Sequence, residues 1–131
     1  MSDQFEVVVG AGSLRADDEA AVRFAHPWTT EGVTVEADFT GGHLLHVAVA
    51  GCVLNDLYRA AAEAGIELAG VRVAASGGFD ARTWASTGIS YTVDIDSADA
   101  PGRLAALLAL VDASAEIPRA VRAGASVRRV S

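Results

Sequence analysis

The hydrophobic pattern of the chain centres on one long apolar stretch between Thr40 and Gly65. The stretch begins with a threonine and two glycines, ends at a glycine and contains no proline, which is typical of a single long helix. Its first half is apolar at nearly every angle around a helix, so this helix should be buried on all sides. Histidines and charged residues between His43 and Glu63 interrupt the run, which therefore indicates a core helix rather than a membrane span.

Three segments before this helix have the pattern of strands. They are residues 5–10, residues 20–24 and residues 33–39, and the last of them alternates between apolar and polar positions with period two. Between the second and third segments, Pro27 and Gly32 indicate a turn. Three strands are therefore predicted to precede the central helix.

Two further strands are predicted after the helix. The first covers residues 66–76 and is expected to end at Gly77. Residues 79–87 then form a predicted loop that carries Trp84. Residues 89–96 alternate more regularly than any other segment, which indicates a strand with one face in water.

The C-terminal third is predicted to contain two helices and an edge strand. A proline in the first turn and leucines at helical spacing predict a helix from Pro101 to about Ala113. Residues 118–123 indicate a short helix with Gly124 as its C-cap, and residues 126–130 a final edge strand.

This order of elements predicts one α+β domain over residues 1–131, with antiparallel sheets around a long buried central helix. A helix that is apolar all round needs more cover than one small sheet and one amphipathic helix provide. Because isologous dimers are the commonest oligomers, we expect a homodimer with its central helices near the two-fold axis.

Charge and cysteine content narrow the classes of partner and compartment. The formal net charge is -7, and all ten cationic residues are arginines scattered along the chain. This balance disfavours nucleic acid and anionic membranes as partners. A single cysteine forms no internal disulfide, and the N-terminus lacks the regions of a secretory signal, so the cytoplasm is the expected compartment.

Cys52, in the middle of the predicted helix, is the first candidate for chemistry. A lone cysteine in an apolar helix is often only a small packed side chain. A reactive thiol instead needs a nearby cation to stabilise the thiolate, and Arg59, two turns along the helix, supplies one only if its side chain bends back. Asp56 lies one turn from Cys52 and is a candidate binding residue.

The histidines are candidate binding residues with simpler alternatives. His43 and His46 are one helical turn apart and could share a metal ion, but no third ligand has motif spacing. His43 is more readily explained as part of the helix start and His46 as a hydrogen-bonded interior or interface residue. His26 precedes Pro27 and is interpreted as a surface loop residue. No metal or cofactor is expected.

The element order, together with Leu-Leu-His-Val-Ala-Val-Ala-Gly-Cys at residues 44–52, resembles the OsmC/Ohr family of osmotically inducible and hydroperoxide-resistance proteins. Residues 70–73 in a later strand and residues 115–121 support the resemblance. It implies an OsmC-like α+β fold, an intertwined homodimer and, in active members, a two-cysteine thiol peroxidase acting on organic hydroperoxides. Cys52 matches the peroxide-attacking cysteine.

The sequence also departs from the family pattern. Ala115 stands where the family has its second, resolving cysteine, and Gly42 stands where it has a helper glutamate. For the helper arginine, Arg15 is the best positional candidate and Arg23 the second, so the arginine that serves Cys52 is Arg15, Arg23 or Arg59.

Two functions follow as hypotheses. The first is a one-cysteine peroxidase in which Cys52 attacks an organic hydroperoxide, an arginine such as Arg15 stabilises the thiolate, and an external thiol restores the cysteine. The second is a non-catalytic dimer that binds a small apolar or thiol-containing ligand in the dimer cleft. A metal site at His43 and His46 is a third, less favoured possibility.

Overall fold

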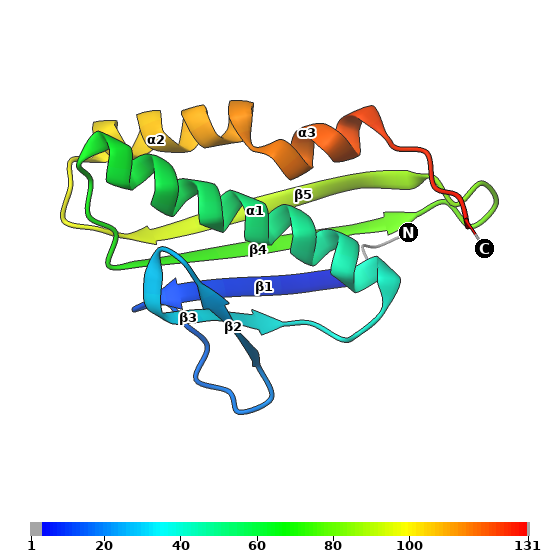
Figure 1. The fold of residues 1–131 in the computed structure, drawn as a ribbon, viewed down its shortest axis with the longest axis horizontal. Coiled ribbons are helices and arrows are strands. Elements are labelled where there is room, and N and C mark those ends of the chain that lie inside the picture. The colour runs from blue at the N-terminus through cyan, green and yellow to red at the C-terminus, as the bar shows by residue number, and fades with distance from the viewer. Residues whose placement is uncertain (1–3, 131) are drawn as a thin grey trace.

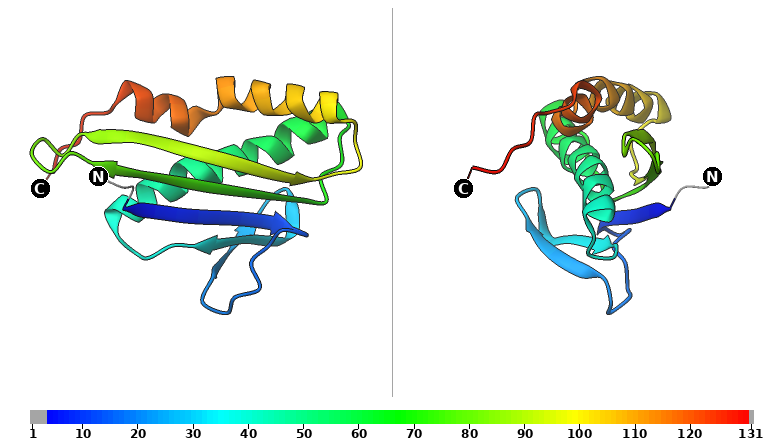
Figure 2. Two further views of the ribbon diagram at one scale, coloured as in Figure 1. Left: turned by 180° about the vertical axis from the view of Figure 1, so that it is seen from behind. Right: turned by 90° about the vertical axis from the view of Figure 1, so that its right-hand side faces the viewer.

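The computed structural model describes residues 4–130, which form a five-stranded antiparallel sheet with helices gathered on one side (Figures 1 and 2). The strands are β1 (Phe5–Gly12), β2 (Val22–His26), β3 (Thr29–Glu36), β4 (Gly70–Phe79) and β5 (Ser86–Asp96). The helices are α1 (Gly41–Ala64), α2 (Pro101–Ser114) and α3 (Glu116–Ala123). The strand order is β2-β3-β1-β4-β5, so the α+β class and the antiparallel sheet are confirmed.

The long helix begins and ends where the sequence predicts. Thr40 is the N-cap of α1, and its side-chain oxygen accepts a hydrogen bond from the backbone N–H of His43. Gly65 is the C-cap and adopts the left-handed conformation with φ of 71°, which a residue with a side chain rarely adopts. The next N–H, that of Ile66, bonds the carbonyl of Ala61 at 2.8 Å, so both helix ends are satisfied by local sequence.

The core lies between α1 and the middle of the sheet. β1 is the central strand, and its inward residues Val7, Val9 and Ala11 are at most 1% exposed. Val9 pairs with Val35 of β3 on one side and with Val73 of β4 on the other. The α1 side chains that face this layer are Ala50, Val53, Leu54, Leu57 and Ala61. Burial of these apolar side chains is the main force that holds the helix on the sheet.

One face of α1 stays open within the single chain. Leu44 and Ala48 are exposed on this face, and Val47, Gly51 and Cys52 are only half-buried. The sheet, α2 and α3 cover the other sides of the helix, as Figure 2 shows. The complete burial predicted for this helix would need a second surface, and another copy of the chain remains the prediction for it.

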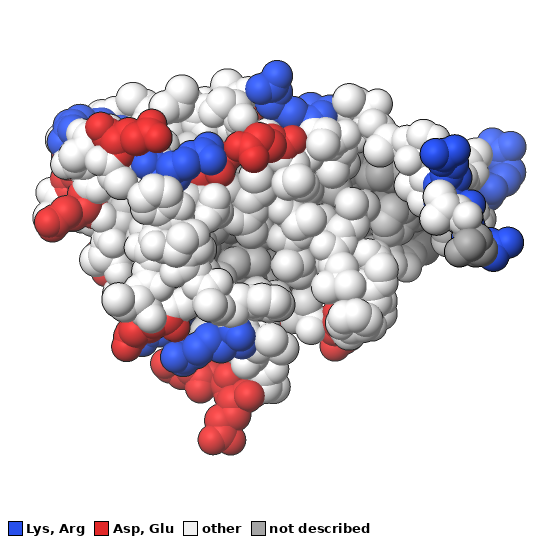
Figure 3. All heavy atoms as spheres, in the orientation of Figure 1, with Lys and Arg blue, Asp and Glu red and all other residues white. Residues whose placement is uncertain are grey.

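The charged side chains leave the middle of this open face free. Figure 3 shows the molecule from the side of α1: basic and acidic side chains gather at the margins, and the centre is without charge. We call this region, which includes Leu44, Val47, Ala48 and Gly51, the open face of α1.

Strand β5 has the alternation that the sequence predicts. Ile89, Tyr91, Val93 and Ile95 are half-buried, while the residues between them are exposed. β5 pairs only with β4 among the described strands, and α2 follows it and covers its inner side chains with Leu104, Leu107 and Leu108.

The predicted end of the fourth strand is wrong. The strand β4 begins at Gly70 rather than at residue 66, and it continues through Gly77, which pairs with Ile89. Gly77 is needed inside the strand because a Cβ there would lie 2.4 Å from the carbonyl oxygen of Gly88 and 2.5 Å from Nε2 of His46. Close approach of a helix side chain, rather than a turn, explains this glycine.

Other boundaries differ for related reasons. β3 begins at Thr29 and includes Gly32, whose φ of 80° lets the chain pass close to the carbonyl of Phe24 in the partner strand. The strand stops at Glu36, and Phe39 is 89% exposed beyond it. The helix α3 begins at Glu116, two residues before the predicted start at residue 118.

The final edge strand predicted for residues 126–130 is wrong. These residues form no strand, and the side chains of Val127 and Val130 are 93% and 84% exposed. Two valines separated by two arginines do not present an apolar face at strand spacing, so the segment gains nothing by joining the sheet. In the described part of the chain, no helix has the length and apolarity needed to cross a membrane.

Candidate functional site

Cys52 lies midway along α1, at the edge of the open face. Its side chain is half-buried, and the cysteine is free. The thiol Sγ lies 3.9 Å from Oδ2 of Asp56, one turn further along the helix. The thiol and this buried carboxylate are the two groups around which the site is built.

The start of α3 lies against the sulfur. The backbone N–H groups of Ile117 and Glu116 both act to lower the pKa of the Cys52 thiol. N–H groups in the first turn of a helix have no partner within the helix and carry partial positive charge. α3 begins directly after Ala115, which is fully buried where α2 ends, so the chain itself places this helix start over the thiol.

The remaining influences raise the pKa of Cys52, and they prevail. Burial is the largest of them, and the carboxylates of Asp56 and Glu116 add to it. The pKa of the Cys52 thiol is therefore above its ordinary value. At neutral pH Cys52 is therefore mainly a protonated thiol with a small thiolate fraction. The N–H groups at the start of α3 can stabilise the thiolate when it forms.

Arg59 links α1 to α3 through two carboxylates. Its Nη2 lies 3.3 Å from Oδ1 of Asp56, and its Nη1 lies 3.5 Å from Oε1 of Glu116. Asp56 is only 3% exposed, so this partner neutralises a charge that would be costly to bury alone. Arg59 thus holds the start of α3 near Cys52 but directs its guanidinium to the carboxylates instead of the sulfur.

A hydrogen-bonded chain joins the β2–β3 hairpin to Asp56. His26 Nε2 lies 3.0 Å from Oδ1 of Asn55, and its Nδ1 lies 2.9 Å from the hydroxyl of Thr29. The amide of Asn55 donates to Oδ1 of Asp56 at 3.3 Å. The prediction that His26 is a surface loop residue is wrong: it is half-buried at the end of β2. Its position before a proline carried no signal of this contact, because the partner is 29 residues away.

An apolar hollow lies beside α1 at Gly51, the residue before Cys52. It has a volume of about 210 Å³ and lies between the β2–β3 hairpin and α1. We call it the hairpin groove; its lining residues are Val9, Phe24, Ala25, His26, Val33, Val35, Val47, Gly51 and Leu54. Gly51 precedes Cys52 in α1, and His26 is the polar side chain in the lining. The groove therefore suits the apolar body of a small molecule.

Neither arginine proposed from family position reaches Cys52. Arg15 forms an ion pair with Glu31, and Arg23 donates to the backbone carbonyl of Glu31 at 3.5 Å. Within residues 4–130, no hydrogen bond or ion pair joins Arg15 or Arg23 to Cys52. Of the three candidate arginines, Arg59 is connected to the thiol through Asp56, which both residues contact.

The two helix histidines have structural roles. The backbone N–H of His43 and its Nδ1 both bond the hydroxyl of Thr40, at 3.1 Å and 2.6 Å, so His43 belongs to the N-cap. His46 is fully buried, with Nδ1 2.6 Å from the carbonyl oxygen of Gly42. Its ring is stacked on Phe5 at 5.8 Å between centroids. Neither histidine adjoins Cys52 in the network described above, and among residues 4–130 no group of three or more potential ligands is placed to hold a metal.

The position of the family's helper glutamate leaves no room for a side chain. A Cβ on Gly42 would lie 2.3 Å from the ring of Phe5, which packs over the start of α1. Phe5 also makes an edge contact with His43, at 5.0 Å between ring centroids. An aromatic cluster of Phe5, His43, His46 and Phe79 thus occupies the region where a carboxylate would otherwise enter.

These features define an α+β domain with one half-exposed thiol on its central helix, facing the start of a second helix. The profile of the family described as OsmC-like protein matches residues 34–128, which begin within β3 and include all the later helices and strands. The chain therefore belongs to the OsmC-like family, which confirms the resemblance stated from the sequence. The matched region includes both Cys52 and Ala115. A search of curated proteins found no match.

Proposed function

We propose that this protein reduces organic hydroperoxides through Cys52 and regains its thiol from an external thiol compound. Family membership points to peroxidase-type or related chemistry in general. The specific proposal rests on the half-buried free thiol of Cys52 at the start of α3, where the backbone N–H groups of Glu116 and Ile117 act to lower its pKa. A side chain that served only for packing has no need of donors to an anion.

The first step is attack of the Cys52 thiolate on the distal oxygen of the hydroperoxide. A sulfur–oxygen bond forms, the oxygen–oxygen bond breaks, and the leaving alkoxide takes a proton to become an alcohol. The sulfur is oxidised by two electrons to a sulfenic acid. The N–H groups of Glu116 and Ile117 stabilise negative charge on the thiolate and on the sulfenate that replaces it.

The second step needs a thiol from outside the chain. With Ala115 at the position of the resolving cysteine and no other cysteine present, no internal disulfide forms. An external thiol attacks the sulfenic sulfur, water leaves, and a mixed disulfide results. A second external thiol then releases Cys52 as a thiol and leaves as the disulfide. A reducing compartment such as the cytoplasm supplies these thiols.

The surroundings of the thiol favour an uncharged substrate with an apolar body. The hairpin groove offers an apolar seat of about 210 Å³ next to Gly51. The two charges that act on the sulfur, those of Asp56 and Glu116, are both negative and repel an anion. Arg59 is already paired with both carboxylates.

A second copy of the chain is the proposed partner that covers the open face of α1. Leu44 is 41% exposed there, and the face bears no charge at its centre. An apolar helix face of this kind is typical of obligate interfaces. In such a dimer the hairpin groove and Cys52 lie at the edge of the interface, so the partner adds walls to the site.

The second candidate function is a non-catalytic dimer that binds a small apolar or thiol-containing ligand in the hairpin groove. The raised pKa of the Cys52 thiol favours it, because little thiolate is present at neutral pH. In that case Cys52 contributes only packing and a polarisable surface to the groove.

Mass spectrometry separates the two candidates. The protein is exposed briefly to cumene hydroperoxide in the presence of dimedone, which traps sulfenic acid, beside a Cys52→Ser control. Peroxidase chemistry predicts one dimedone adduct per chain at low peroxide and none in the control. An unchanged mass in excess peroxide, with the protein folded by circular dichroism, excludes the peroxidase and leaves the ligand-binding dimer.

A further inference from the structure

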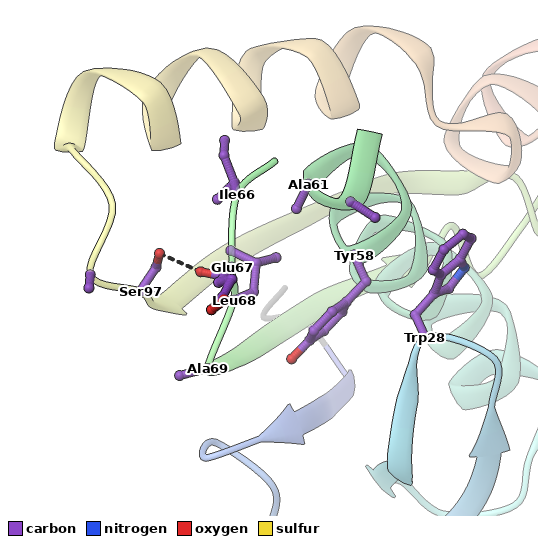
Figure 4. A pocket seen from close by; sticks show the side chains of 10 residues that line it. Trp28, Tyr58, Ala61, Ile66, Glu67, Leu68, Ala69 and Ser97 are labelled. Atoms are coloured by element: carbon purple, nitrogen blue, oxygen red, sulfur yellow. Dashed lines mark hydrogen bonds between the residues drawn. The ribbon is translucent and has the colours of Figure 1, made fainter. Parts of the chain in front are cut away.

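A second hollow lies away from Cys52, at the C-terminal end of α1. It has a volume of about 450 Å³ and is bounded by Trp28, the last turns of α1, residues 66–69 and the start of the β5–α2 connection (Figure 4). A smaller hollow of about 300 Å³ shares Trp28, Tyr58, Leu68 and Ala69 with it. We call the two together the Trp28 cleft.

The walls of the larger hollow are mostly apolar. Ala61 and Ile66 are buried in its wall, and Leu68 is half-buried. Trp28, in the β2–β3 turn, is 44% exposed at the rim. The total size falls within the range of small-molecule sites, and an aromatic ring at the edge of an apolar hollow offers a flat surface for packing.

Tyr58 places an unused hydrogen-bond donor at this cleft. Tyr58 is 9% exposed, and its hydroxyl is buried with no hydrogen-bond partner among residues 4–130. In Figure 4 its ring extends from α1 with the hydroxyl toward the side of Leu68 and Ala69. Burial raises the pKa of Tyr58, so the hydroxyl keeps its proton and remains a donor. Buried hydroxyls without a partner are uncommon and are costly to the fold.

The charges around the cleft select against an anion. Glu67 lies at the rim, and the guanidinium of Arg15 in the smaller hollow is already paired with Glu31. Among the described residues that line the cleft, no cationic side chain is therefore left unpaired to bind a carboxylate or phosphate. The hydroxyl of Tyr58 alone requires only a neutral acceptor.

We propose that the Trp28 cleft binds a small uncharged molecule with an aromatic or acyl body and a carbonyl acceptor, to which the Tyr58 hydroxyl donates while Trp28 packs against the body. This site does not involve Cys52. Its test is therefore independent of the peroxide chemistry proposed above.

Two probes of similar shape test the role of the hydroxyl. Acetophenone carries an aromatic ring and a ketone, and ethylbenzene has a similar shape without the acceptor. Each is titrated into ¹⁵N-labelled protein, with the indole N–H signals of Trp28 and Trp84 assigned from Trp84→Phe. Trp84 lies in the β4–β5 hairpin and is 72% exposed, so it serves as an internal control.

The proposal predicts saturable acetophenone shifts at the Trp28 indole and the Leu68 and Ala69 amides, with the Trp84 indole unmoved. Tyr58→Phe should weaken acetophenone binding roughly 2- to 10-fold, the usual worth of one hydrogen bond, and leave ethylbenzene binding unchanged. Trp28→Ala, a change at an exposed residue, should weaken both probes. The Tyr58→Phe protein should be at least as stable as the parent, because an unpaired buried hydroxyl is removed.

Two results would overturn the proposal. One is the absence of a saturable shift at the Trp28 indole up to the solubility limit of acetophenone. The other is an equal acetophenone affinity in the parent and in a folded Tyr58→Phe variant, which would mean that the cleft collects apolar molecules without using the hydroxyl.

Discussion

The backbone N–H of Ile117 lowers the pKa of Cys52 across the contact between α3 and α1. Together with the N–H of Glu116 it opposes the effects of burial and of two carboxylates on the thiol. The balance leaves the pKa of Cys52 above its ordinary value, and the predictions for the thiol follow from that balance.

The first prediction concerns pH. Alkylation by iodoacetamide requires the thiolate, so with a raised pKa the rate should still climb above about pH 8.5, the ordinary pKa of free cysteine. Asp56→Asn removes a negative charge that raises the pKa of Cys52, so its profile should shift to lower pH. Rates are measured by intact mass between pH 6 and about pH 10. Glu116→Gln, at a more exposed carboxylate, is the matched variant and should shift the profile less. An identical profile for Asp56→Asn would contradict the electrostatic account.

The second prediction concerns the charge of the reagent. Iodoacetate and iodoacetamide differ in one negative charge, and the carboxylates beside Cys52 should slow the former. The rate ratio of iodoacetamide to iodoacetate should exceed that of N-acetylcysteinamide by a few-fold at low salt and fall in Glu116→Gln. A ratio equal to that of the free thiol at low salt would show that the site does not discriminate by charge.

The third prediction restores the missing cysteine. Ala115 directly precedes the two residues whose backbone N–H groups act on the pKa of Cys52, so a thiol at this position should reach the sulfur. After treatment with one equivalent of cumene hydroperoxide, Ala115→Cys should lose both free thiols to an internal disulfide. Ala113→Cys, an exposed position in α2, is the control and should not close such a bond. Retention of two free thiols in a folded Ala115→Cys protein would show that the family alignment misplaces the second cysteine.

The fourth prediction concerns packing at Gly77. A methyl group there would meet the carbonyl oxygen of Gly88 at 2.4 Å and the ring of His46 at 2.5 Å. Gly77→Ala should therefore lower the free energy of unfolding by about 1–3 kcal/mol. Gly102→Ala, in α2 with nothing within 4 Å of the new methyl, should be neutral or slightly stabilising. Thermal unfolding of both variants provides the comparison, and equal melting temperatures would count against the contact with His46.

The fifth prediction tests the proposed dimer. Ala48 is exposed on the open face of α1, so Ala48→Arg should place a charge in the interface and yield a folded monomer. Ala105→Arg, at an exposed position of α2, should leave the mass unchanged. Light scattering at micromolar concentration distinguishes the outcomes. A parent protein that is already monomeric there would remove the dimer from the proposal.

The sequence predicts correctly those elements whose ends or exposed faces depend only on residues close by in the chain. Both ends of α1 follow from Thr40 and Gly65, whose capping roles depend only on neighbouring residues. The alternation of β5 likewise reports its half-buried face. Gly77 was misread as a strand end because its real constraint, the ring of His46, comes from another element.

The candidate site was predictable only in part. Cys52 and Asp56 are one helical turn apart, so their proximity follows from sequence alone. The contact of His26 with Asn55 depends on how the β2–β3 hairpin folds over α1, and the N–H groups of Ile117 and Glu116 depend on where α3 starts. These are tertiary relations between distant segments, for which a single sequence carries no periodic signal.

The presence of alanine at position 115 has a consequence for how the protein experiences oxidation. Under the proposed chemistry, each chain is oxidised once, at one sulfur, and has no second thiol of its own to reduce it. The sulfenic acid persists until a thiol from the surroundings reacts with it, so its lifetime depends on the concentration of that thiol. A second cysteine would have removed the sulfenic acid quickly by forming a disulfide. Without one, the fraction of chains oxidised at Cys52 depends on the ratio of peroxide to thiol reductant in the surroundings.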